Sequence, residues 1–398
     1  MQLKKAARGV APILLSAGMV AAGAGVAGAA TKTHTGGAPT ISASSFNRNF
    51  TTMAQLKGLV AKGSGKVAAI LPDTTSSARY TEFDAPYLHE AFAKAGLPAS
   101  DVIIQNAQGS DATEYADAQA DITQGAKVLV MDPLDSGVGA RIEKYAAAHG
   151  AKVVDYDRLT LGGSRQYYVS FNNVRVGQLL GKGFVSCAAA WGVKHPNVLV
   201  MRGAPTDNNA TLFANGYMSV LNPLAKKHKI TIVGQPPGTW TPSVALTTFE
   251  QQFTAHKTMN SALVPNDENG APIINWLKTQ QHVRARSFPI TGQDATLTGL
   301  QNILSGYQCG TVYKPIYLEA QAAAALAIYL RAGVTPPKTL ANGTTMDTTE
   351  HKGVASVLLT PEWVTTKNMK ATIIADNFVK ASQLCTGAYG PMCKAAGI

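Results

Sequence analysis

The chain has 398 residues, of which 45% are hydrophobic and 15% are charged, and its formal net charge is +11. This composition excludes a disordered or collagen-like chain, and the length is enough for about two domains. Only the N-terminus carries a long apolar run, and the basic residues form no block of five or six, so a multi-span membrane protein and a nucleic-acid partner are not expected.

The first 29 residues have the pattern of a secretory signal peptide. Lys4, Lys5 and Arg8 precede an apolar stretch over residues 10–26, and Ala27-Gly28-Ala29 fits the A-x-A cleavage pattern. An uncleaved membrane anchor is the alternative, but the many Gly and Ala residues favour cleavage. We therefore expect export to the periplasm or to the outer face of the cell membrane, with a formal charge of +8 (32 basic and 24 acidic residues) on the remaining chain.

Residues 30–64 are rich in Thr, Ser, Gly and Ala, which predicts a flexible leader with one short helix within Thr51 to Lys62. From Lys66 onward, short β-rich runs alternate with helical stretches. In chain order the predicted elements are strand 67–71, helix 81–95, strand 102–105, helix 113–124, strand 127–131, helix 138–149, strand 152–156, strand 167–171, helix 174–190, strand 197–201, helix 209–225, strand 230–234, helix 243–256, strand 261–265, helix 270–279, strand 287–291, helix 295–305, strand 310–313 and helix 316–331. Repeated βαβ units indicate an α/β fold with two doubly wound, Rossmann-like lobes.

The four cysteines fit an oxidising compartment. Cys385 and Cys393 bracket a seven-residue loop in a C-terminal tail, residues 385–398, and could close a small disulfide, with Cys187 and Cys309 as a second possible pair. Four cysteines allow three connectivities, and the sequence does not choose between them. The chain has no CxxC, HxxxH or EF-hand pattern, so we expect no metal and no cofactor.

Polar residues follow seven of the predicted strands. Because the carboxyl ends of parallel strands meet at the edge where α/β sheets bind ligands, these residues predict a polar cleft. One such loop would mean little, since Asp and Asn also cap helices. The seven segments are Pro72-Asp73, Asp132-Pro133, Tyr156-Asp157-Arg158, 203–209, Asn266-Asp267, Gly292-Gln293-Asp294 and Tyr313-Lys314-Pro315.

The residue types in this cleft suit a sugar. Asp, Asn, Arg and Lys offer paired donors and acceptors that match vicinal hydroxyls. Trp240, in a Gly- and Thr-rich loop, fits a ring that lies against a sugar face, with a core aromatic as the alternative. Tyr80, beside Arg79 in the first loop, fits the opposite wall, although an isolated Arg is more often a surface residue.

The sequence gives weaker evidence for catalysis than for sugar binding. Asp155 lies near Asp157, so paired-carboxylate glycoside hydrolysis is the enzymatic alternative, but one structural and one binding carboxylate explain the two residues better. No G-x-S-x-G elbow occurs and no G-x-G-x-x-G follows the first strand. Residues 58–66 lack the Gly-Lys-Ser/Thr ending of a P-loop. We therefore expect a binding protein and not an enzyme.

Five segments of the cleft together resemble a known family. Over roughly residues 64–375 the chain looks like a periplasmic sugar-binding protein of ABC importers, of the ribose-binding type and nearest to its D-xylose-binding branch. The segments are Asp155-Tyr156-Asp157-Arg158, Tyr168-Val169-Ser170-Phe171, Asp207-Asn208-Asn209-Ala210, Gly292-Gln293-Asp294-Ala295 and Thr311-Val312-Tyr313-Lys314-Pro315.

The resemblance implies a type I periplasmic binding protein fold, in which the chain crosses three times between two discontinuous lobes. It places the crossovers near 171–174, near Thr311 and near 342–350. The N-terminal lobe would then comprise residues 65–171 plus 312–345, and the C-terminal lobe residues 172–311 plus 346–384.

The resemblance also implies a set of ligand-binding residues. The N-terminal lobe would contribute Arg79, Asp157 and Arg158, the C-terminal lobe Asp207, Asn209, Asn266 and Asp294, and the second crossover Lys314, with Trp240 stacking on the sugar. Tyr80 stands where family members often have Trp, which bears on the identity of the sugar.

The implied function is the capture of a monosaccharide, D-xylose first, by a monomer that delivers it to the membrane subunits of an ABC permease without covalent chemistry. Two alternatives are an exported carbohydrate-active hydrolase that uses Asp157 or Asp267, and a sugar-sensing component for a chemoreceptor or sensor kinase.

Overall fold

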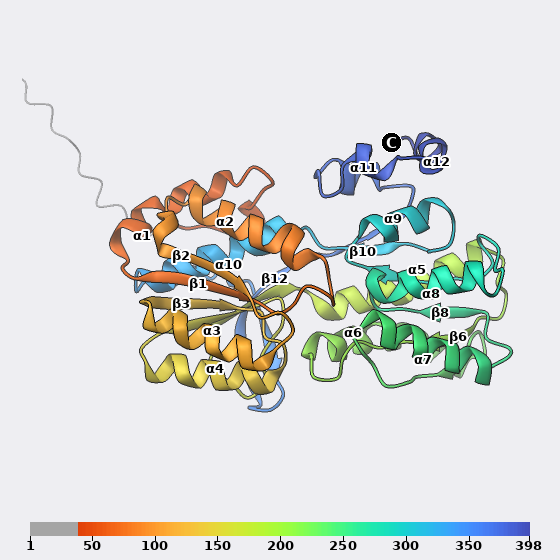
Figure 1. The fold of residues 1–398 in the computed structure, drawn as a ribbon, viewed down its shortest axis with the longest axis horizontal. Coiled ribbons are helices and arrows are strands. Elements are labelled where there is room, and N and C mark those ends of the chain that lie inside the picture. Colours follow the sequence, from red (N-terminus) through yellow and green to blue (C-terminus); the bar gives the residue numbers. More distant parts are fainter. Residues whose placement is uncertain (1–38) are drawn as a thin grey trace, which may run out of the picture. The chain divides into compact units, whose positions relative to one another are not determined.

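Two mainly parallel sheets, each with helices on both faces, organise the chain in the computed structural model, which describes residues 39–398 (Figure 1). The predicted α/β fold with two doubly wound lobes is confirmed. The predicted signal peptide and the start of the predicted leader lie outside the described residues. None of the helices within residues 39–398 is long and apolar enough to cross a membrane.

The first lobe is built on a seven-stranded sheet in which every neighbouring pair is parallel except β11 and β12. One face is covered by α1 (Lys57–Lys62), α2 (Ala85–Lys94) and α10 (Ile316–Arg331), and the other by α3 (Asp111–Thr123) and α4 (Ser136–Ala148) (Figure 1). In sheet order the strands are β11 (Gly343–Asp347), β12 (Lys352–Leu359), β5 (Tyr167–Phe171), β4 (Lys152–Tyr156), β3 (Ala126–Met131), β1 (Lys66–Leu71) and β2 (Val102–Asn106).

Successive residues of β1 serve two different cores. Val67, Ala69 and Leu71 belong to the core beneath α2 and α10, whereas Ala68 and Ile70 belong to the core beneath α3 and α4. Side chains of a strand alternate between its two faces, so a strand that is covered on both sides is apolar at every position. This accounts for the continuous apolar run by which the first strand was predicted.

The second lobe repeats this plan with shorter strands. Its helices α5 (Asn173–Ala190) and α6 (Asn208–Lys226) pack against each other, and α7 (Pro242–Ala255) packs with α8 (Asp267–Thr279). The strands are β7 (Thr231–Gly234), β6 (Asn197–Val200) and β8 (Ser261–Leu263), then β9 (Gly292–Gln293), β10 (Thr311–Tyr313) and β13 (Glu362–Val364). A single parallel bridge from Ala262 to Ile290 joins the two sets. The predicted strand 287–291 is reduced to this bridge because Pro289 has no N–H to donate to a neighbouring strand.

The third connection between the sheets corrects the predicted lobe boundary. Strand β12 pairs in parallel with β5, so residues 346–359, which were assigned to the C-terminal lobe, complete the first sheet. The chain returns to the second sheet between Leu359 and Glu362, and not at 342–350. The other two connections follow Phe171 and Tyr313. Sequence patterns did not reveal this pairing because β5 and β12 are separated by the whole second lobe.

The predicted flexible leader is wrong for the residues that the structure describes. A 3-10 helix (Thr51–Leu56) runs directly into α1, which matches the short helix expected there. Phe50, Met53, Leu56 and Leu59 recur every three residues and are fully buried in the first lobe's core. The Ser- and Thr-rich composition concealed this apolar stripe.

Both cysteine pairs form disulfides, Cys187 with Cys309 and Cys385 with Cys393. The C-terminal segment, residues 365–398, contains the second disulfide together with α11 (Ala381–Leu384) and α12 (Tyr389–Ala395), which pack against α9 (Leu297–Leu304). The same segment reaches the first lobe, where the ring of Phe378 stacks on Phe83 with centroids 3.9 Å apart. It therefore contacts both lobes.

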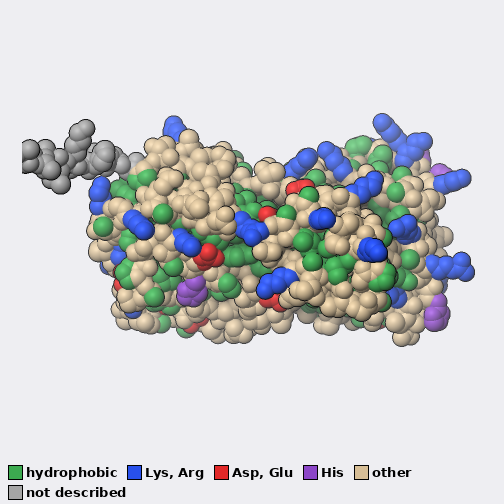
Figure 2. All heavy atoms as spheres, turned by 90° about the horizontal axis from the view of Figure 1, so that it is seen from above, with side chains coloured by type: hydrophobic (Ala, Val, Ile, Leu, Met, Phe, Trp, Pro, Cys, Tyr) green, Lys and Arg blue, Asp and Glu red, His purple; other side chains and the backbone are tan. Residues whose placement is uncertain are grey.

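Lys and Arg side chains are spread over the face in Figure 2, more densely over the second lobe, and do not form one continuous stripe.

Candidate functional site

All ten residues that the sequence singled out line one cavity between the two lobes. The cavity measures about 30 Å³, which is room for one or two water molecules, so a larger guest requires its walls to move apart. The ten residues are Arg79, Tyr80, Asp157, Arg158, Asp207, Asn209, Trp240, Asn266, Asp294 and Lys314. Four further lining residues, which sequence reasoning missed, are Ser76, Ser77, Phe213 and Gln293.

Arg79 is the most heavily bonded cation of the cavity. Its guanidinium donates to both carboxylate oxygens of Asp84, at 2.8 and 2.7 Å, to Oε2 of Glu319 at 2.6 Å, and to Oδ1 of Asp157 at 2.9 Å. Arg79 directly precedes a π-helical turn (Tyr80–Asp84), and Asp84 is the last residue of that turn. The turn brings the side chains of Arg79 and Asp84 together. Arg79 is only 3% exposed, and the buried carboxylates of Asp84 and Asp157 compensate its charge.

These cations control the charge of Asp157. Burial alone would raise the pKa of this carboxyl, but Arg79, Lys314 and Arg158 outweigh burial and hold the pKa below its usual value. Asp157 is therefore an ionised acceptor in the cavity. Glu319 differs, because burial raises its pKa to about 8 in spite of Arg79.

Arg158 connects the two lobes across the cavity. Its Nη2 donates to the Tyr80 hydroxyl at 3.0 Å, and its Nε lies 3.7 Å from a carboxylate oxygen of Asp132 in the first lobe and 3.7 Å from one of Asp207 in the second. Neither carboxylate oxygen of Asp132 has a hydrogen-bond partner within residues 39–398. Burial raises the pKa of Asp132 well above its usual value.

The second lobe presents its polar side chains as helix caps. Oδ1 of Asp207 accepts from the Asn209 amide at 2.8 Å at the start of α6, and Oδ1 of Asn266 accepts from the Asn269 amide at 3.2 Å at the start of α8. Such residues are favoured at these positions because they satisfy the free N–H groups of a helix start. The cap uses Oδ1 of each side chain, while Oδ2 of Asp207 accepts from Trp240 and Nδ2 of Asn266 donates to Glu268 at the cavity wall.

Two carboxylates of the cavity sit on left-handed backbone. Asp157 has φ of +56° and Asp294 has φ of +86°, and each directly follows a strand of its lobe. This conformation costs of order 1 kcal/mol or more for a residue other than glycine and clusters at functional sites. Oδ1 of Asp294 pairs with Nζ of Lys314 at 2.9 Å. Burial alone would lower the pKa of Lys314, but Asp294 and Asp157 raise it.

Trp240 is fixed from two sides. Its Nε1 donates to Oδ2 of Asp207 at 2.9 Å, and its ring meets Phe213 edge to face. A Cβ atom on Gly203 would overlap the indole, so only glycine at that position lets the loop carry Trp240 so close. The Nε1–Asp207 hydrogen bond leaves the ring as a wall of the cavity with its polar atom satisfied.

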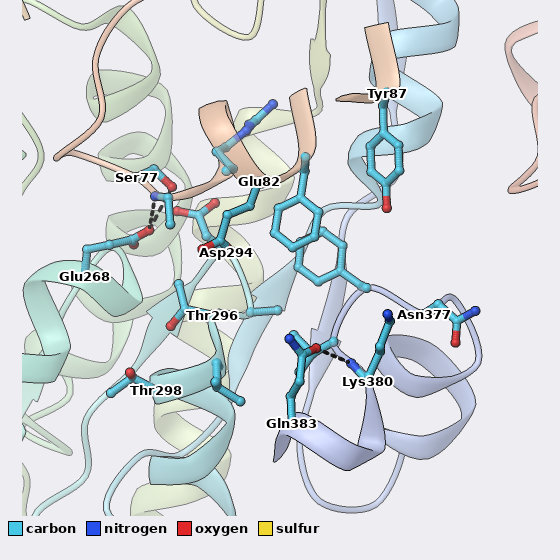
Figure 3. A pocket seen from close by; sticks show the side chains of 17 residues that line it. Ser77, Glu82, Tyr87, Glu268, Asp294, Thr296, Thr298, Asn377, Lys380 and Gln383 are labelled. Atoms are coloured by element: carbon cyan, nitrogen blue, oxygen red, sulfur yellow. Dashed lines mark hydrogen bonds between the residues drawn. The ribbon is translucent and has the colours of Figure 1, made fainter. Parts of the chain in front are cut away.

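Glu268 joins the lobes directly at the edge of the cavity. Its Oε1 accepts from the Ser77 hydroxyl at 2.8 Å and from the Ala78 amide at 3.3 Å (Figure 3). Its Oε2 accepts from Nδ2 of Asn266 at 3.0 Å. Sequence reasoning passed over Glu268 although it follows Asn266 and Asp267 at a strand end. It also missed Glu319, whose signal was a lone acid in an Ala-rich helix.

The acids considered for catalysis are largely structural. Asp155 is fully buried and accepts from the amide and hydroxyl of Thr160. Asp267 accepts from the Thr296 amide at 2.9 Å and from Gln308 Nε2 at 2.7 Å, and it does not line the cavity. Within residues 39–398 no cluster of His, Cys, Asp and Glu is placed to hold a metal ion.

Gln293 adds an unpaired acceptor to the cavity. Its side chain is 2% exposed, and its Oε1 has no hydrogen-bond partner in the described part of the chain. A buried polar atom without a partner is costly and calls for an explanation.

Comparison with known proteins gives consistent results. A family model described as a periplasmic binding protein domain matches residues 68–334. The D-xylose-binding periplasmic protein of Escherichia coli K12 is 38% identical over 295 residues, which cover 73% of this chain and 85% of that protein. The multiple sugar-binding periplasmic receptor ChvE of Rhizobium radiobacter is 31% identical over 281 residues, covering 66% and 77% respectively. A carbohydrate transporter solute-binding protein of Chloroflexus aurantiacus, solved in complex with D-glucose, superposes with a TM-score of 0.72 at 28% identity, covering 80% of this chain and 97% of that one.

Proposed function

The chain belongs to the periplasmic sugar-binding proteins of ABC transporters and has their type I fold, and from this premise we propose that it captures one monosaccharide, D-xylose, in the cavity between its lobes for delivery to an ABC importer. The proposal includes export across the cytoplasmic membrane, action as a monomer, and no covalent chemistry. The membrane subunits of the importer are the protein partner.

One observation carries the proposal: charged donors and acceptors from both lobes line the same cavity. Asp157, Asp207 and Asp294 are carboxylates, and Arg79, Arg158 and Lys314 are cations. A sugar hydroxyl donates one hydrogen bond and accepts others, so vicinal hydroxyls satisfy carboxylates and cations in pairs. A site of this kind discriminates against ligands that leave its buried polar groups unpaired.

The existing ion pairs make the cavity ready for such a ligand. Asp157 pairs with Arg79 at 2.9 Å, and Asp294 pairs with Lys314 at 2.9 Å. These charged groups are already buried in the folded protein. The free-energy cost of removing them from water therefore arises during folding and not when a sugar binds. The names of the relatives from Escherichia coli and Haemophilus influenzae, both D-xylose-binding, support the choice of D-xylose.

Isothermal titration calorimetry of residues 30–398 against xylose, ribose, arabinose, glucose and galactose tests the proposal. We expect one-to-one binding with xylose as the tightest ligand, and loss of binding in Asp294→Ala. Glu90→Ala, an exposed acid on α2, is the matched control and should bind as the unmodified chain does. Folded protein that gives no heat with any of the five sugars overturns the proposal, and turnover of a chromogenic xyloside would point to the hydrolase instead.

A further inference from the structure

A second and much larger hollow adjoins the sugar cavity. This outer chamber measures about 590 Å³ and lies between the first lobe, α9 and the C-terminal segment (Figure 3). Ser77, Arg79 and Asp294 line both the cavity and the chamber. The two spaces are therefore neighbours with these three residues as common walls.

The chamber walls come from three parts of the chain. Glu82 and Tyr87 belong to the first lobe, Thr298 to the first turn of α9, and Lys380 to the C-terminal segment (Figure 3). They supply a carboxylate, a phenol, a hydroxyl and an ammonium group, and the stacked rings of Phe83 and Phe378 add aromatic surface. Aromatic faces beside mixed donors and acceptors are suited to a sugar ring, which has apolar faces and a polar rim.

Because three residues line both spaces, one ligand of sufficient length can contact both. A sugar oxygen that is bound by Asp294 or Arg79 from within the cavity lies beside a residue that also faces the chamber. A substituent on that oxygen can extend into a space of 590 Å³, which is within the usual range of ligand pockets. The Ser77–Glu268 hydrogen bond lies on the boundary between the two spaces. A glycosidic linkage that crosses this boundary would have to break that hydrogen bond.

We propose that the outer chamber is a second saccharide subsite, which takes the next ring of a disaccharide whose first ring occupies the cavity. The inference rests on the proposed function and extends its ligand class from free monosaccharides to short glycosides. A β-1,4-linked disaccharide probes both directions, because either its reducing or its non-reducing ring can enter the cavity.

Thr298→Trp tests the subsite without touching the cavity. Thr298 is exposed, lies on α9 and lines the chamber but not the cavity, so an indole there fills the chamber alone. Thr247→Trp is the matched control, since Thr247 is an exposed threonine on helix α7 of the same lobe and lines neither space. The probes are xylose and glucose, with xylobiose and cellobiose as their β-1,4 disaccharides, each titrated calorimetrically into the full mature chain.

We expect the disaccharide of the preferred sugar to bind, and Thr298→Trp to weaken it by roughly tenfold or more while the monosaccharide changes by less than about twofold. Thr247→Trp should leave both unchanged. The inference is overturned if a monosaccharide binds and neither disaccharide does, or if disaccharide binding survives Thr298→Trp undiminished. If neither a monosaccharide nor a disaccharide binds, the proposed function fails and the subsite fails with it, whereas monosaccharide binding alone keeps the function and removes only the subsite.

Discussion

The two lobes hold their halves of the cavity by different means. In the first lobe Arg79 is locked among the buried acids Asp84 and Glu319, so the site is built from compensated charges. In the second lobe Asp207 and Asn266 are helix caps held by backbone amides, and the lobe is further tied by the Cys187–Cys309 disulfide. The first lobe therefore holds its site residues by buried ion pairs, whereas the second lobe holds them by backbone hydrogen bonds at helix starts. We expect substitutions in the two lobes to change the free energy of unfolding by different amounts.

The largest effect is expected in the first lobe. Asp84→Ala removes the two-pronged partner of Arg79 and leaves a buried guanidinium undercompensated, which should lower the free energy of unfolding by about 3–5 kcal/mol. Loss of a cap in the second lobe, by Asn266→Ala, should cost only about 1 kcal/mol. Urea unfolding of both variants measures the contrast, and equal losses would contradict it.

The disulfide of the second lobe comes next. Replacing Cys187 and Cys309 together by Ala opens a loop spanning 122 residues and should lower the free energy of unfolding by about 2–4 kcal/mol. The double Ala variant of Cys385 and Cys393, which frees a separation of only 8 residues, is the control and should lose less. A larger loss in the control would show that the C-terminal segment, and not the second lobe, depends on its covalent link.

A pH titration of stability separates buried acids from paired ones. Burial raises the pKa of Glu114 in the first lobe to about 8, so the folded state holds a proton that the unfolded chain releases above its ordinary pKa of roughly 4.3. Stability from this group is complete at low pH and is lost as pH rises towards 8, at up to about 1.4 kcal/mol per pH unit. Glu114→Gln should therefore flatten the dependence of the unfolding free energy between pH 5 and 8, and an unchanged slope would contradict the assignment.

Asp157 contributes to the pH dependence of stability in the opposite direction to Glu114. Its folded pKa is lowered, so its contribution to stability is present above the unfolded pKa of roughly 3.9 and is lost as pH falls below that value. Glu114→Gln leaves this acid limb of the titration in place, which makes the limb an internal control.

The smallest effect concerns the hydroxyl of Tyr80. Tyr80→Phe keeps the ring and removes the acceptor of the Arg158 Nη2 hydrogen bond, whose net worth is about 1 kcal/mol. We expect the free energy of unfolding to fall by about 1 kcal/mol in urea unfolding, and sugar affinity to fall by up to roughly fivefold in calorimetry because Arg158 is held less firmly. Tyr307→Phe, outside the cavity, is the control, and identical behaviour of the two variants would remove Tyr80 from the site.

Much of this arrangement was accessible from the sequence because parallel sheets bring the carboxyl ends of distant strands to one edge. The positions of Asp157, Asn266 and Asp294 follow from that rule alone. Their convergence on one cavity is now established, and their role in binding sugar stays a prediction. Helix 316–331 was predicted to the residue, since its Ala-rich sequence contains neither Gly nor Pro and lies between Pro315 and Gly333.

What the sequence could not supply are pairings between distant segments. Glu319 contacts Arg79 although the two are 240 residues apart in the sequence, and no local sequence pattern predicts that contact. Strand β12 reaches β5 across the second lobe, and the connectivity of four cysteines is a matter of three-dimensional proximity. In each case the partner is chosen by tertiary packing, which local propensity does not encode.

The pairing of β12 with β5 has a consequence for the order in which the chain can be completed. The first lobe begins near residue 41 but lacks two strands of its sheet until residues 343–359 have been synthesised, after the entire second lobe. Until then β5 is an unprotected sheet edge, the kind of surface at which incomplete chains associate. The first lobe is thus the first to be synthesised, but its sheet is completed only after most of the second lobe. A chain truncated before residue 343 would be expected to aggregate, although its second lobe holds nearly all of its strands.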